Sequence, residues 1–226
     1  MSAACQSLPV SPFVPLAVPT LAIHRIQPQP RHPRGFYVIC LVVACERWAA
    51  YTLSALAVLM ISERYGYSRS DALRLVSLMS AASYLGTLPG GMLIDKVLGY
   101  RRAVTLSTVL LGLGYAALIR SSPLALLLSL ALLVMGSALF KPSMQSVLAR
   151  LYPADDARLE AAQTWFYMAV NAGAAVGALV AGLVARKAGW GAPFALASAV
   201  MLTAWILLSL FRADLPLGPL VQQPRS

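Results

Sequence analysis

Six long apolar stretches, separated by short polar breaks, run along most of the chain. They cover residues 36–62, 70–93, 103–119, 123–149, 160–185 and 192–211. Each has about 17 residues or more, which is the length that an α-helix needs to cross the hydrocarbon core of a bilayer. The pattern therefore predicts an all-α membrane protein, with a bundle of six transmembrane helices in residues 35–212.

The polar breaks contain residues that favour helix starts. Ser68-Arg69-Ser70-Asp71 resembles a capping box in front of the second stretch. Ser121-Ser122-Pro123 opens the fourth stretch, and proline is tolerated in the first turn of a helix. Both breaks predict a new helix immediately downstream.

The two ends of the chain lack such apolar stretches. Residues 1–34 carry seven prolines and a basic cluster, and the early prolines interrupt any helix of the kind found in signal peptides. We expect a disordered, basic tail near acidic lipid headgroups, or a segment produced by a start codon assigned too far upstream. Residues 213–226 are expected to form a disordered C-terminal tail.

The charge distribution agrees with the membrane class. Only 12% of the residues are charged, about half the fraction usual in a soluble domain. The net charge of +10 comes from basic residues scattered at the ends of apolar stretches, which argues against a nucleic-acid groove. With the N-terminus inside, ten Lys and Arg lie on the inner side and six on the outer side. This bias predicts a multi-pass protein of the cell (inner) membrane with both termini cytoplasmic.

Three charged residues, Glu46, Arg47 and Lys141, interrupt the apolar stretches. A charge near the bilayer centre costs roughly 2.5–3.5 kcal/mol on insertion scales, so such residues generally face a bundle interior or a water-filled cavity. The helical rise places Arg47, Tyr84 and Asn171 roughly 17 Å, and Lys141 roughly 14 Å, from the inner side. Four helices are thus expected to bring hydrogen-bonding groups to one level near the bilayer centre, where transporters built from repeats hold their substrates.

The residue types at this level favour an anionic ligand. Arg47 and Tyr51 are one turn apart on one helix face, and Glu46 is close enough to help neutralise the arginine. One negative charge against two positive charges favours a carboxylate ligand, which a guanidinium binds through two parallel hydrogen bonds. Glu46, beside cations, is a candidate for proton exchange. Three structural alternatives stay open: a charge cluster that only holds helices together, tyrosines that only pack, and an Asn171 that only bridges helices.

Enzymatic chemistry has no support in the pattern. The cysteines lack metal-ligand spacing, and both histidines fall in the N-terminal tail. We find no nucleophile–base pair and no nucleotide-binding loop in the predicted spans. The sequence therefore predicts no catalytic residue, no metal site and no cofactor.

Five segments match, in order, the motifs of one known protein family. Glu46-Arg47-Trp48 with Tyr51 is similar to ExxERFxYYG in the first helix, and Gly90-Gly91-Met92-Leu93-Ile94-Asp95-Lys96 with Leu98-Gly99 is similar to the loop motif GGxLADRxLG. Phe140-Lys141-Pro142-Ser143 resembles LLKPN, Asp156-Ala157-Arg158-Leu159-Glu160 resembles DxRRD, and Phe166-Tyr167-Met168-Ala169-Val170-Asn171-Ala172-Gly173 resembles FYxxINxG. These segments resemble the motifs of the proton-dependent oligopeptide transporter (POT) family of the major facilitator superfamily, and the likeness extends from about residue 36 to residue 211.

The resemblance implies the N-terminal six-helix half of a peptide:proton symporter, made of two inverted three-helix repeats. It implies that small peptides are bound by Arg47, Tyr51, Tyr84, Lys141 and Asn171. Of these, Arg47 and Lys141 would meet the peptide carboxylate, and Asn171 would lie near the peptide's amino end. Glu46 would belong to the proton-coupling group, and Gly91, Asp95 and Lys96 to a gating loop.

The chain departs from the family pattern in two respects. Val43 stands where the family has its first glutamate, one turn before Arg47 on the same face, so one proton-exchanging partner is missing. Family members also have at least twelve spans, whereas this chain supplies six. Three explanations remain open: a truncated product, a half that pairs with a second six-helix half or with itself, and a non-transporting accessory or structural subunit.

Overall fold

The computed structural model describes residues 31–153 and 156–216, so most of the predicted N-terminal tail, and residues 217–226 of the C-terminal one, lie outside the described residues. Within the described part, the chain forms seven α-helices and no strand. Their bounds are α1 Arg34–Tyr65, α2 Arg69–Leu85, α3 Thr87–Leu93, α4 Gly99–Ala117, α5 Pro123–Arg150, α6 Arg158–Ala188 and α7 Gly191–Leu210. The predicted all-α class is confirmed.

Four of these helices, α1, α5, α6 and α7, are long and apolar enough to cross a membrane. The predicted first, fourth, fifth and sixth spans correspond to them. The remaining two predicted spans correspond to α2 with α3 and to α4. The six predicted spans therefore do not correspond one to one to the seven α-helices of the described residues.

The predicted second span, 70–93, is divided at Gly86. Pro89 has no backbone N–H, so the carbonyl of Leu85, four residues earlier, receives no helical hydrogen bond from it. One π-helical turn, Ile94–Leu98, follows α3, and Gly99 then adopts a φ of 70°, a left-handed conformation that glycine adopts without strain. The loop between α3 and α4 is therefore a helical turn that leads directly into α4.

The predicted helix starts are confirmed at two breaks. The Ser68 hydroxyl accepts a hydrogen bond from the backbone N–H of Asp71 at 3.1 Å, and the Ser122 hydroxyl accepts one from Ala125 at 3.1 Å. Each satisfies a backbone donor that has no partner within its own helix. Pro123 occupies the first helical position of α5.

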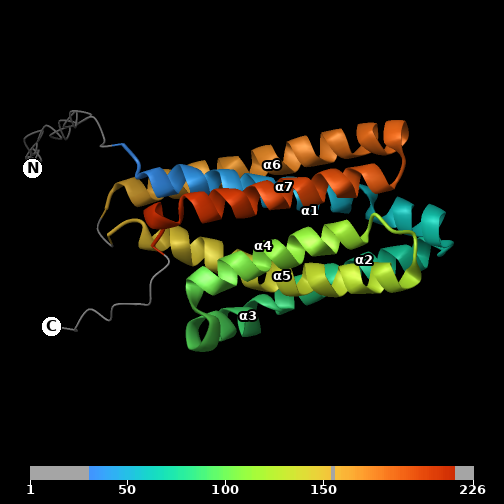
Figure 1. Cartoon of the computed structure of the whole chain (residues 1–226), viewed down its shortest axis with the longest axis horizontal. Coiled ribbons are helices and arrows are strands. Elements are labelled where there is room, and N and C mark those ends of the chain that lie inside the picture. The colour runs from blue at the N-terminus through green and yellow to red at the C-terminus, as the bar shows by residue number, and fades with distance from the viewer. Residues whose placement is uncertain (1–30, 154–155, 217–226) are drawn as a thin grey trace, which may run out of the picture. The chain divides into compact units, whose positions relative to one another are not determined.

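The helices form two neighbouring groups. Figure 1 shows α1, α6 and α7 side by side, with α4 and α5 packed together in the other group beside α2. The helices α1 and α6 approach each other closely because α6 carries glycine where their backbones meet. A Cβ atom on Gly173 would lie 2.2 Å from the carbonyl oxygen of Ala44, and one on Gly177 would lie 2.2 Å from that of Trp48. This contact fixes the rotation of α6 relative to the helix that carries Arg47.

Candidate functional site

Arg47, Tyr84 and Lys141 converge from α1, α2 and α5 on two adjoining hollows. The first, termed here the tyrosine recess, has a volume of about 230 Å³ and is lined by these three residues with Tyr51 and Tyr115. The second, the valine recess, has a volume of about 320 Å³. It is lined by the same three residues with Val43, Glu46, Phe140, Phe166 and Tyr167, among others. Ligand pockets in proteins typically measure about 300–1,000 Å³, so the pair is of ligand size.

Glu46 and Arg47 form a two-point ion pair. Nε and Nη2 of Arg47 donate hydrogen bonds to Oε2 and Oε1 of Glu46, each at 2.5 Å. Glu46 is 1% exposed, whereas the Arg47 side chain keeps 18% exposure. A guanidinium has five N–H donors, so three of the five remain for another partner. The arginine is therefore positioned by the glutamate and still presents donors to the recesses.

Lys141 faces an aromatic ring. Its Nζ lies 3.8 Å from the centroid of the Tyr84 ring, within the range of a cation–π interaction. Among the described residues that line the two recesses, Glu46 is the one carboxylate, and it is held by Arg47. The predicted surplus of one positive charge is thus present in the geometry.

Val43 lies on the wall of the valine recess and is 3% exposed. It shares this wall with Glu46, Arg47 and Phe140. The position at which the POT motif has a carboxylate is therefore apolar here, beside the guanidinium.

Asn171 does not line either recess. Its side chain is exposed on α6, one turn beyond Tyr167, which does line the valine recess. Residues four apart share a helix face, so Asn171 lies on the same open side of α6 as Tyr167. Its part in a site depends on what covers that side.

Tyr115 and Phe166 are among the recess residues that were not singled out from the sequence as site residues. Tyr115 is 2% exposed and lies on α4 at the back of the tyrosine recess. The one sequence signal that could have identified Tyr115 is a phenol group inside an apolar stretch. Phe166 is 4% exposed and belongs to the motif that carries Asn171.

The predicted gating loop lies away from both recesses. Asp95 and Lys96 are exposed in the π-helical turn, and an added Cβ on Gly91 would meet nothing within 4 Å. The Tyr100 hydroxyl donates to Asp95 Oδ1 at 2.6 Å, and the guanidinium of Arg150 lies 3.7 Å from the centroid of the Tyr100 ring. The loop is thus connected to the start of α4 and the end of α5.

Another ion pair lies at the start of α6, between Asp156 and Arg158. Arg158 donates to both carboxylate oxygens of Asp156, at 2.9 Å from Nε to Oδ1 and 2.6 Å from Nη2 to Oδ2. These side-chain hydrogen bonds, with one from the Arg158 backbone, lower the pKa of Asp156 to about 2. The carboxylate is therefore ionised throughout the physiological range.

Comparison with known proteins assigns the family. The profile of the Major Facilitator Superfamily matches residues 39–225. The dipeptide and tripeptide permease A of Cronobacter turicensis is 35% identical over 174 residues, which cover 76% of this chain and 35% of that protein. The permease of the same name from Erwinia pyrifoliae is 34% identical over 184 residues, which cover 80% of this chain and 37% of that protein. The chain thus spans about a third of the length of these curated relatives.

Solved structures agree with this assignment. A peptide transporter POT in complex with alafosfalin superposes with a TM-score of 0.80 and 30% identity, over 88% of this chain and 43% of that one. A POT family transporter in complex with 5-aminolevulinic acid superposes with a TM-score of 0.78 and 28% identity, over 81% of this chain and 39% of that one. This chain is therefore an integral membrane protein that belongs to the Major Facilitator Superfamily and, within it, to the proton-dependent oligopeptide transporter family.

Proposed function

We propose that the chain forms one six-helix half of a proton-coupled symporter for di- and tripeptides in the cell (inner) membrane, with both termini cytoplasmic. The observation that carries the proposal is the convergence of Arg47 and Lys141, from α1 and α5, on ligand-sized recesses that hold a surplus positive charge. Relatives named as dipeptide and tripeptide permeases support peptides as the substrate class. A second six-helix half, or a second copy of the chain, completes the enclosure.

In this proposal the peptide carboxylate binds between the two cations. The N–H groups of Arg47 that Glu46 does not use, together with the Lys141 ammonium, supply charge-assisted hydrogen bonds. Tyr51 and Tyr84 line the recess around the peptide, and Asn171 lies toward the peptide's amino end, across the side of α6 that the second half covers.

Glu46 is the proposed proton-coupling residue. Its ionised carboxylate holds two of the Arg47 donors. Uptake of a proton by Glu46 weakens this hold and releases the guanidinium toward the peptide. Gly91, Asp95 and Lys96 act in gating at the inner side, through the contacts between Asp95 and Tyr100.

Peptide uptake tests the site. The chain is co-expressed with the complementary half of a homologous permease, and uptake of a labelled dipeptide is measured in proteoliposomes. We expect Arg47→Ala to abolish uptake, whereas Arg69→Ala, at an exposed position on α2 outside both recesses, serves as the matched control and keeps it. A dipeptide with an amidated C-terminus is expected to compete poorly, because it lacks the carboxylate.

Uptake by Arg47→Ala at the wild-type rate would show that the ion pair only holds α1 in place. In that case tolerance of Lys141→Gln, together with a tight complex with another membrane protein, would favour the accessory-subunit function.

A further inference from the structure

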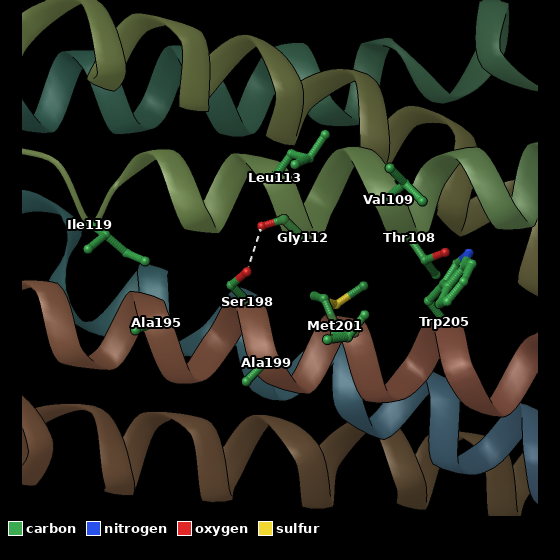
Figure 2. Close-up of a pocket in the computed structure, with 11 residues that line it drawn as sticks. Thr108, Val109, Gly112, Leu113, Ile119, Ala195, Ser198, Ala199, Met201 and Trp205 are labelled. Atoms are coloured by element: carbon green, nitrogen blue, oxygen red, sulfur yellow. Dashed lines mark hydrogen bonds between the residues drawn. The ribbon is translucent and has the colours of Figure 1, made fainter.

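A third hollow lies between α4 and α7, apart from both recesses. This α4–α7 groove has a volume of about 530 Å³, and none of its lining residues lines the tyrosine or the valine recess. Small residues line it, namely Gly112 of α4 and Ala195, Ser198 and Ala199 of α7, and Figure 2 shows Ser198 pointing toward Gly112. An added Cβ on Gly112 would meet the Met201 side chain only at 3.6 Å. A side chain at position 112 would therefore reach ordinary van der Waals contact with Met201, and Gly112 forms part of the wall of the groove.

Apart from the indole N–H of Trp205, the wall of the groove presents mainly hydrocarbon to an occupant. Its two hydroxyl groups are already used, because Ser198 donates to the Gly112 carbonyl at 3.0 Å (Figure 2) and Thr108 donates to backbone carbonyls of its own helix. A ligand with many donors or acceptors would lose its hydrogen bonds to water there without replacement. The chemistry of the wall favours an apolar chain.

The groove has the length of one bilayer leaflet. Figure 2 shows Ile119 and Ala195 at one end and Thr108 beside Trp205 at the other. Ala195 and Trp205 are ten residues apart on α7, which corresponds to roughly 15 Å along the helix axis. Half of a hydrocarbon core of about 30 Å has the same length. The Ala195 end lies one turn after the start of α7 and so near the membrane interface, whereas the Trp205 end lies five residues before the end of α7, so the groove continues past the middle of this helix.

Positive charge surrounds the interfacial end of the groove. Arg120 directly follows Ile119 and is exposed, and Arg186 and Lys187 are exposed in the last turn of α6. The α6–α7 turn lies next to Ile119, because an added Cβ on Gly191 would be 3.6 Å from the Ile119 carbonyl oxygen. Cations beside a membrane surface attract anionic headgroups. An apolar channel of one leaflet's length with a basic mouth has the complementary chemistry of a phospholipid.

We propose that the α4–α7 groove is a binding site for a phospholipid, with one acyl chain along the groove and the phosphate against Arg120 and the basic end of α6. Lipid tails are as apolar as the groove, so no hydrophobic driving force selects the bound lipid. The lipid is retained instead by close packing of its acyl chain in the groove and by the charge at the mouth. The site is independent of the peptide site and of its proposed function.

The test uses the full chain in lipid nanodiscs that contain a small fraction of anionic phosphatidylglycerol with a photoactivatable diazirine in one acyl chain. After irradiation, labelled peptides are mapped by mass spectrometry. We expect labelling to concentrate on residues 108–119 and 195–205, above the level on the exposed faces of α6. With Ala199→Phe, whose ring fills the groove from its exposed side, labelling of these segments should fall to the α6 level.

Two further variants complete the design. Thr203→Phe adds a ring at an exposed position of the same helix outside the groove, and should label like the wild type. Gly112→Leu fills the groove from α4 and covers the case in which Ala199→Phe does not fold. Arg120→Gln should lower labelling by the anionic probe and leave that by a phosphatidylcholine probe unchanged.

Three results would overturn the proposal. They are uniform labelling of all exposed helix faces, wild-type labelling in both groove-filling variants, and covalent dimers cross-linked through α4 and α7. The last result would assign the groove to a second copy of the chain.

Discussion

Gly177 is the position at which the smallest change should have a large effect. An added Cβ would lie 2.2 Å from the Trp48 carbonyl oxygen and 2.9 Å from two further backbone atoms of Trp48. Non-bonded contacts of this length do not occur, and a helix backbone, unlike the end of a flexible side chain, has no rotamer by which to yield. Gly177→Ala therefore forces α1 and α6 apart by roughly 1 Å at a contact that is already close-packed.

The expected change in the free energy of unfolding of Gly177→Ala follows from two opposing effects. Overpacking of a tight contact costs about 1–3 kcal/mol. Replacing glycine with alanine within a helix contributes about 1 kcal/mol in the opposite direction. The net result is a loss of up to about 2 kcal/mol, equivalent to a fall in Tm of several degrees for a protein of this size, at about 2–4 °C per kcal/mol.

Gly182→Ala provides the matched control, because it lies on the same helix and an added Cβ there would meet nothing within 4 Å. Only the helix-propensity gain applies to it, so its Tm should equal or exceed that of the wild type. Both variants are compared by thermal unfolding in the same detergent, followed by tryptophan fluorescence. Equal melting temperatures for Gly177→Ala and Gly182→Ala would refute the close approach of α1 and α6. Because Arg47 immediately precedes Trp48, dipeptide affinity should fall in Gly177→Ala alone.

Two more predictions concern charge. Val43→Glu places a second carboxylate on the wall that Arg47 shares, so peptide uptake in the presence of a complementary half should depend more steeply on pH. The uncharged Val43→Gln should keep the wild-type pH profile. An unchanged pH profile in Val43→Glu would contradict the view that Val43 replaces a proton-exchanging carboxylate. The pKa of Asp156 is lowered to about 2 by its hydrogen bonds with Arg158, so the stability that this pair contributes is complete above the usual carboxyl pKa and is lost as the pH falls through about 2. Carbon-13 NMR of the Asp156 carboxyl should show a midpoint near 2 that rises toward the ordinary value of 3.8 in Arg158→Gln, and a wild-type midpoint near 3.8 would contradict the pairing.

The depth of side chains was predictable from the sequence, but their direction was not. Helix boundaries and a fixed rise per residue place Arg47, Tyr84 and Lys141 at one level, and in the structure the three line common recesses. The same reasoning gave Asn171 a similar depth but no rotation about the α6 axis. That rotation is set by Gly173 and its contact with α1, and Asn171, two residues earlier, points about 200° away from it.

The break in the second predicted span could have been predicted from the sequence, but the continuous hydrophobicity of residues 70–93 favoured a single helix. Pro89 removes one hydrogen bond from an otherwise apolar stretch, which favours a break in the helix. The length of the stretch favours one continuous membrane-spanning helix instead. Three-dimensional packing decides such a conflict. Here Gly90 allows α3 to lie against α5, since an added Cβ would be 2.3 Å from the Ala138 carbonyl oxygen. The divided helix is thus held by a close contact that no single-sequence pattern shows.

The exposed polar side chains around the recesses imply a partner surface. Tyr84 is 67% exposed, Tyr167 58% and Tyr51 43%, and Asn171 is exposed beside them on α6. At the bilayer centre, hydroxyl, amide and ammonium groups are stable against protein or a water-filled cavity but costly against lipid tails. Glu46 is held by Arg47, and Lys141 lies against the Tyr84 ring at the same open side. We therefore expect the second half of our proposal to cover the face formed by α1, α2, α5 and α6, while the hydrocarbon wall of the α4–α7 groove is suited to lipid.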